Sequence, residues 1–277
     1  MYVARWPLKG PRPPCGSRLE HLTGALSVAA LPGLPPVRPG DDLAALLADA
    51  APDDLGDGDV MVVAHKVVSK AEGRLRRLAA IEPGARADEL AAEHGKDPRL
   101  VQAILDESAA LVGAGHGVLV CETNHGLICA NAGVDRSNTA DPDEVVLLPT
   151  DPDASARRLR AGIASVRGVR PAVVVADSFG RAWRLGQTDV AIGAAGIVAL
   201  DDWRGRPDWT GRPLRATAIA VADAVAGAAD LARSKDSAEP AVLVRGLERF
   251  VTAEDGAGAG ALRRPAAEDL FREGWTR

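Results

Sequence analysis

The chain has 277 residues, of which 47% are apolar and 26% charged, and its formal net charge is −5. These values are typical of a soluble globular protein with a large core, and they exclude a strongly basic nucleic-acid-binding protein. Aromatic residues make up only 3%, which argues against stacking platforms for single strands, and no apolar run reaches the roughly 18 residues that a membrane span needs.

The first part of the chain predicts a loose extension followed by a folded domain. Residues 1–25 combine basic residues and prolines without an apolar segment, so we interpret them as a disordered or loosely held extension and not as a signal peptide. Prolines across 31–40 exclude a helix there, because each proline fixes φ and lacks an N–H donor. Asp41 is expected to cap a short helix that runs to about Ala50, and the apolar run at 60–64 predicts a strand.

A basic segment follows this strand. Lys66, Lys70 and Arg74 are spaced by four residues, so they would share one face of a helix. Basic groups at the start of a helix that follows a strand suit an oligophosphate, although a solvated charged face is an equally simple interpretation. The chain has no Walker A motif and no GxGxxG after a strand, so any nucleotide site is of another type.

The middle of the chain predicts helices and one hairpin. Helices are expected at 86–94 and 98–112, the second with apolar residues on one face and a cap before its first turn. Apolar runs around Thr-Asn-His-Gly predict a β-hairpin over 117–131. Asp151 precedes a proline and opens another helix, whose buried side is expected to include Val166.

The turn over 131–138 contains candidate metal ligands. Asp135 and Asn138 offer side-chain oxygens on a glycine-containing turn that follows the hairpin. Asx residues in turns often only bond their own backbone, and that interpretation stays open. Asp135 would gain a functional role if a second carboxylate lay at a neighbouring strand end.

Such a carboxylate follows the apolar strand predicted at 173–176. Asp177 and Ser178 come directly after this strand, and Arg181 and Arg184 follow them. A carboxylate, a hydroxyl and two guanidinium groups suit a metal ion and a phosphate, whereas a polar turn with surface arginines is the alternative. Together with Asp135, this segment predicts a hard-oxygen site for Mg²⁺ or Mn²⁺.

The remaining segments complete a mixed architecture. A loop is expected at 201–212, a strand at 214–221, a helix at 222–233 and a strand at 241–245, followed by a C-terminal tail over 251–277. Strands and helices alternate irregularly, which favours an α+β fold with mixed sheets and flanking helices. Three cysteines without CxxC spacing argue against a disulfide framework or a structural zinc site and favour a cytoplasmic protein.

The order and spacing of these motifs from about residue 26 to 250 resemble the coenzyme F420:L-glutamate ligase family, also called coenzyme F420-0:γ-glutamyl ligases. The segments that carry the resemblance are 34–43, 66–74, 131–138, 151–155, 177–189 and 244–246. Residues 262–271 are similar to the sequence that follows this domain in two-domain actinobacterial members. The nitroreductase-like second domain of those members has no counterpart here, so the chain resembles a stand-alone ligase domain over 26–250.

The resemblance implies a GTP-dependent ligase. It would join the α-amino group of L-glutamate to the carboxylate of coenzyme F420-0 through an acyl phosphate, and then add successive γ-linked glutamates. It implies Mg²⁺ or Mn²⁺, with K⁺ as a further ion. The implied metal positions are Asp135, Asp177 and Ser178, and the implied GTP-contacting positions are Leu34, Pro35, Pro36, Val37, His65, Lys66, Lys70 and Asn138. Arg181 and Arg184 are expected, from their chemistry, to bind the growing anionic tail or the acyl phosphate.

The resemblance also implies an assembly and shows where this chain departs from its relatives. Family members form intertwined homodimers of an α+β fold with two lobes, and we expect the same here. The loop Arg233–Glu239 keeps only the basic character of the family's glycine-rich nucleotide loop, with Lys235 expected to contact GTP. Two alternatives stay open: a nucleotide-dependent amide ligase with a different carboxylate substrate, and a non-enzymatic nucleotide-binding module.

Overall fold

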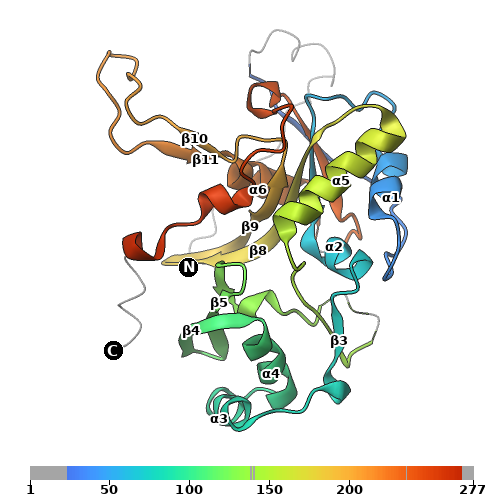
Figure 1. The fold of residues 1–277 in the computed structure, drawn as a ribbon, viewed down its shortest axis with the longest axis vertical. Coiled ribbons are helices and arrows are strands. Elements are labelled where there is room, and N and C mark those ends of the chain that lie inside the picture. The colour runs from blue at the N-terminus through green and yellow to red at the C-terminus, as the bar shows by residue number, and fades with distance from the viewer. Residues whose placement is uncertain (1–23, 138, 140, 235, 270–277) are drawn as a thin grey trace, which may run out of the picture.

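The computed structural model describes residues 24–137, 139, 141–234 and 236–269, and it is an α+β protein as expected (Figure 1). Its centre is a five-stranded sheet in the order β1-β12-β2-β8-β9. The pair β2–β8 is parallel and the other three pairs are antiparallel. The five strands are β1 (Ser27–Ala30), β2 (Val60–Ala64), β8 (Ala172–Arg181), β9 (Arg184–Ala195) and β12 (Ala241–Arg245).

Helices cover both faces of this sheet, because the inner strands are apolar on both sides. The valine-rich strands send alternate side chains into two separate cores. One core packs against α1 (Leu43–Ala50) and α5 (Pro152–Arg167), and the other packs against α6 (Val221–Ala232). The sequence defines α5 at both ends, since Asp151 caps its first turn and Gly168 ends it with a left-handed φ.

A second lobe lies at one end of the sheet and has its own apolar core (Figure 1). It contains α3 (Ala85–His94), α4 (Pro98–Asp106) and a three-stranded sheet of β4 (Ser108–Gly115), β5 (Val118–Thr123) and β6 (Ile128–Ala130). The short pair β3 (Leu75–Arg77) and β7 (Glu144–Val146) joins this lobe to α2 (His65–Ala71).

Two ribbons extend away from the main body (Figure 1). One is the outer half of β8–β9, where Trp183 and Leu185 are 82% and 99% exposed. The other is β10 (Leu200–Asp202) with β11 (Ala218–Ala220) and the loop between them, where Trp209 is 97% exposed. Both ribbons therefore expose large apolar side chains to solvent.

Several elements have other boundaries in the structure than the sequence predicted. The helix expected over 98–112 ends at Asp106, because Ser108–Gly115 pairs with β5 as a strand. The strand expected over 214–221 is reduced to Ala218–Ala220, because Val221 already begins α6. The strand expected at 173–176 continues through its polar residues to Arg181, because β9 pairs with all of them.

Two smaller expectations are also corrected. Asp42, and not Asp41, caps α1 by accepting a hydrogen bond from Ala45 N. Asp41 instead accepts a hydrogen bond from Arg38 N at 2.7 Å. Val166 of α5 is 52% exposed and does not contribute to the core. Among the described helices, none is both long and apolar enough to cross a membrane.

The segment after β12 is held against the main body although it contains only 3-10 turns. Arg160 of α5 is 1% exposed and donates to the carbonyl oxygens of Thr252 and Ala253 and to the carboxylate of Asp255. Asp153, in the first turn of α5, accepts hydrogen bonds from the backbone N–H groups of Ala259 and Gly260. This part of the tail is therefore part of the folded body.

Candidate active site

The register of the parallel strands places the first two candidate residues side by side. β2 and β8 pair Ala64 with Ala176, so His65 and Asp177 are the residues that directly follow this pair in the two segments. His65 Nε2 lies 3.2 Å from Asp177 Oδ1, and His65 Nδ1 lies 3.4 Å from Ser69 Oγ. The His65 side chain is 3% exposed and that of Asp177 16%, so the pair lies at the wall of the site and is largely shielded from solvent.

The neighbouring residue on α2 holds the second carboxylate. Lys66 Nζ lies 2.6 Å from Asp135 Oδ2 and donates a hydrogen bond to Ser137 Oγ at 2.5 Å. The backbone of Asp135 is fixed by a bridge to Val146. Burial alone would raise the pKa of Asp135, but hydrogen bonds from Lys66 and Ser137 outweigh it and lower the pKa. Asp135 is therefore an anion at neutral pH.

Asp135 and Asp177 converge on adjacent residues of one helical turn, although they come from different lobes and are 42 positions apart. Within the described chain, no three His, Cys, Asp or Glu side chains form a metal-binding group. Two carboxylates still suit Mg²⁺, which binds few protein oxygens and takes its other ligands from water and substrate phosphates. The donor set fits such an ion better than it fits zinc.

The basic segment divides into two parts. Lys66 and Lys70 lie one turn apart on α2, whereas Arg74 lies beyond the helix and binds Leu148 O and Glu107. The expectation that all three basic groups share one face is therefore wrong, because α2 ends at Ala71 and the chain turns at Gly73. Burial and the nearby charge of Lys66 lower the pKa of Lys70.

A buried group of three side chains behind Asp177 was not expected from the sequence. Ser178 Oγ donates to Asp189 Oδ1 at 2.6 Å, and Arg233 pairs with the other oxygen of Asp189. Arg233 also donates to Pro240 O. This group connects a candidate metal ligand to the end of α6 and the loop that follows it. Asp189 falls on a strand at an unremarkable position, and no spacing rule singles it out.

The segment 34–37 lies near the start of α1. Leu34 packs against the first core and Val37 is buried, whereas Pro35 and Pro36 line an open cleft of about 450 Å³. Arg38 lines the same cleft. Asn138 and Lys235, both expected to contact GTP, lie outside the described residues.

Arg181 and Arg184 lie at the tip of the β8–β9 ribbon and are exposed. Arg181 is four residues beyond Asp177, which corresponds to about 13 Å along a strand. Arg181 donates to Leu185 O within the same tip. The structure therefore does not bring these two arginines next to Asp177, and their role in binding an anionic tail stays a prediction.

The hairpin of the second lobe comes close to this site at Cys129. The strand β6 carries Cys129 and packs against β8. Burial and the nearby carboxylate of Asp177 raise the pKa of the Cys129 thiol to about 12. Cys129 is therefore a buried and unreactive thiol.

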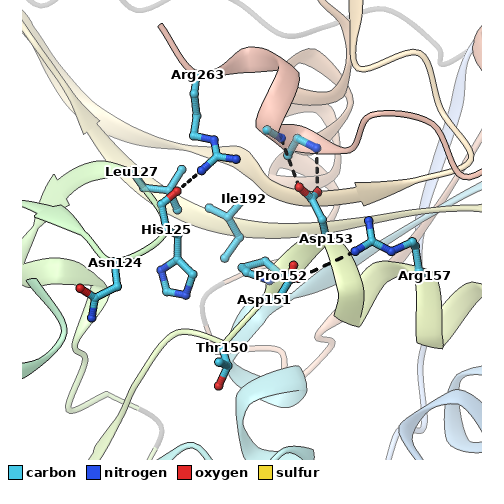
Figure 2. A pocket seen from close by; sticks show the side chains of 12 residues that line it. Asn124, His125, Leu127, Thr150, Asp151, Pro152, Asp153, Arg157, Ile192 and Arg263 are labelled. Carbon is cyan, nitrogen blue, oxygen red and sulfur yellow. Dashed lines mark hydrogen bonds and ion pairs between the residues drawn. The ribbon is translucent and has the colours of Figure 1, made fainter. Parts of the chain in front are cut away.

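A second cleft, of about 350 Å³, opens between the two lobes and the C-terminal segment (Figure 2). His125 and Leu127 of the β5–β6 turn form one wall, and the first turn of α5 forms another. Ile192 of β9 closes the floor, and Arg263 of the C-terminal segment lies across the top. No pattern in the sequence had associated these residues with one another.

Comparison with known proteins agrees with the resemblance seen in the motifs. A family model described as F420-0:Gamma-glutamyl ligase matches residues 33–246. The coenzyme F420:L-glutamate ligase of Methanopyrus kandleri is 46% identical over 241 residues, which cover 85% of this chain and 93% of that protein. The ligase of the same name from Methanothermobacter thermautotrophicus is 42% identical over 251 residues (89% of this chain, 99% of that protein), and that from Haloarcula marismortui is 45% identical over 255 residues (90% and 96%). The chain therefore belongs to the F420-0:γ-glutamyl ligase family.

Proposed function

We propose that this protein is a GTP-dependent ligase that adds L-glutamate to coenzyme F420-0 and then extends the product with γ-linked glutamates. The names of its relatives support the amide-forming reaction and both organic substrates. The single structural observation that carries the proposal is the convergence of Asp135 and Asp177 on the first turn of α2. A protein that only bound a nucleotide would have no need of two such carboxylates from separate lobes.

The reaction has two steps. A carboxylate oxygen of the acceptor attacks the γ-phosphorus of GTP, which gives an acyl phosphate and GDP. The amino group of glutamate then attacks the acyl carbon, phosphate leaves, and the nitrogen loses a proton. Phosphoryl transfer of this kind depends mainly on positioning and on neutralising the phosphate oxygens.

The residues of the site divide these tasks. Asp135, Asp177 and Ser178 would hold Mg²⁺ or Mn²⁺, which supplies positive charge to the phosphates when bound. Lys66 and Lys70 project from the same helix and would bind phosphate oxygens. Asp135 keeps its charge at neutral pH because Lys66 and Ser137 lower its pKa.

We further propose that the protein acts as a homodimer. The exposed Trp183, Leu185 and Trp209 on the two ribbons support this, since an apolar side chain that is almost fully exposed is stabilised by contact with a second chain. The tip of the β8–β9 ribbon carries Arg181 and Arg184, which are too far along the strand to reach Asp177 of the same chain.

The test is mass spectrometry of F420-0 incubated with the protein, L-glutamate, GTP and Mg²⁺ or Mn²⁺. We expect a ladder of products that differ by one glutamyl residue, and equimolar release of GDP and phosphate. The ladder should be lost when GTP is omitted and in the Asp177→Asn variant, and it should persist in Asp88→Asn, which changes an exposed carboxylate on α3. Binding of GTP without any product from F420-0 would contradict the proposal and favour a different carboxylate substrate.

A further inference from the structure

The cleft shown in Figure 2 has no role in the chemistry described so far, and its position relates it to the active site. Its floor residue, Ile192, lies two positions from Val190, which pairs with Asp177. Its wall residue, Leu127, lies two positions from Cys129 on β6, and β6 packs against β8, the strand that carries Asp177. Two residues of strand correspond to about 7 Å, so both walls of the cleft lie on segments that run toward Asp177.

The walls of the cleft are fixed by close backbone contacts. A Cβ atom at Gly193 would lie 2.2 Å from Pro152 O, so only glycine lets β9 meet the start of α5. A Cβ atom at Gly260 would lie 2.7 Å from Arg263 Nη2, and one at Gly126 would lie 3.3 Å from Arg263 Nη1. The Arg263 guanidinium therefore lies between two glycines, and it donates to His125 O. It joins the C-terminal segment to the β5–β6 turn.

The cleft presents both signs of charge. Arg263 lies on one side and Arg157 on another, with the Asp151 carboxylate 3.8 Å from Arg157 (Figure 2). Asp153 accepts three hydrogen bonds from the backbone N–H groups of Ala194, Ala259 and Gly260, so its carboxylate holds the wall of the cleft together. Two guanidinium groups and the carboxylate of Asp151, which also caps α5 through Ala154 N, match an amino acid with two carboxylates and one ammonium group.

We propose that this cleft binds the L-glutamate substrate, with Arg157 and Arg263 holding its two carboxylates and Asp151 facing its amino group. The volume of about 350 Å³ lies at the low end of the range for small-ligand sites, which suits an amino acid. The proposal rests on the proposed ligase function, and it places the nucleophile in a cleft whose walls run toward Asp177. It also makes Arg263, in the C-terminal segment, a residue that determines substrate specificity.

The test combines kinetics with direct binding. Arg157→Ala and Arg263→Ala should each raise the KM for L-glutamate by about 10- to 100-fold, because each removes a charge-assisted bond to a carboxylate. The KM values for GTP and F420-0 should change by less than a factor of about 2, as should all three in the control Arg86→Ala, whose guanidinium is exposed on α3. Isothermal titration calorimetry with L-glutamate alone should show binding to the wild type and weaker binding to the two cleft variants.

The outcomes separate this proposal from the function itself. An unchanged KM for glutamate in both cleft variants of an active ligase would overturn the glutamate site and leave the function intact. A raised KM for GTP with an unchanged KM for glutamate would also overturn the glutamate site and leave the function intact. If the wild type makes no glutamyl product, the function fails, and calorimetry still decides whether the cleft binds glutamate. Equal glutamate binding, or none, in wild type and cleft variants overturns the proposal.

Discussion

Replacing Arg160 by methionine should destabilise the protein strongly. The guanidinium is 1% exposed and donates five hydrogen bonds, to the carbonyl oxygens of Arg170, Pro171, Thr252 and Ala253 and to the carboxylate of Asp255. Methionine fills a similar volume but leaves these acceptors without their donor. Removing one partner of a buried ion pair costs about 3–5 kcal/mol in general.

The expected loss lies at the low end of that range. The Asp255 side chain is 29% exposed and also pairs with Arg170 at 3.1 Å, so water and a second guanidinium partly compensate it. We therefore expect a loss of about 3 kcal/mol in the free energy of unfolding. For a chain of roughly this size, that corresponds to a fall in Tm of about 6–12 °C.

Differential scanning calorimetry at neutral pH measures this effect. Arg160→Lys should fall between the wild type and Arg160→Met, because lysine keeps the charge but has only three donors. Arg86→Met is the matched control on the exposed face of α3, and it should change the free energy of unfolding by less than about 0.5 kcal/mol. A Tm loss under about 2 °C in Arg160→Met would refute the view that Arg160 anchors the tail.

Four further predictions concern the site and the assembly. Asp177→Asn should lower turnover by about 100-fold or more and weaken Mn²⁺ binding measured by electron paramagnetic resonance, and near-normal turnover at low Mn²⁺ would remove Asp177 from the metal site. Lys70→Ala should raise the KM for GTP by about 10-fold and leave that for glutamate unchanged, whereas Lys96→Ala, which removes another lysine of lowered pKa, should change neither. Because the pKa of Lys70 is lowered, its contribution to GTP affinity should be lost, as pH rises, earlier than that of an exposed lysine; a pH series of GTP binding checks this. Sedimentation velocity should show a dimer, for which we expect an interface above about 2,000 Å², and Leu185→Ser should shift the equilibrium toward monomer. An active monomer at micromolar concentration would contradict this prediction.

The sequence predicted well those elements whose own residues determine them. The valine run of β2 and the capped, proline-initiated α5 were found where the structure has them. Residues 108–112 were misassigned to a helix because small apolar residues are compatible with helix or strand, and pairing with β5 decides between the two. Such pairing depends on tertiary contacts, which outweigh local propensity.

The candidate site was predictable only in part, for a related reason. Carboxylates after apolar strands are visible in the sequence, and both Asp135 and Asp177 reach the first turn of α2. The pairing of Asp189 with Arg233 joins residues 44 positions apart, and neither lies in a spacing pattern. The glutamate cleft draws its walls from both lobes and the C-terminal segment, so only the folded chain reveals it.

The folded body extends beyond the C-terminal end of the family match, which is residue 246. Carbonyl groups of residues 252–253 and the amide groups of Ala259 and Gly260 satisfy Arg160 and Asp153 on α5. A proteolytic cut or a gene fusion placed directly after β12 would therefore uncover a guanidinium and a carboxylate inside the main body. A second domain can be attached without that damage only beyond about Arg263, after the tail has completed the cleft.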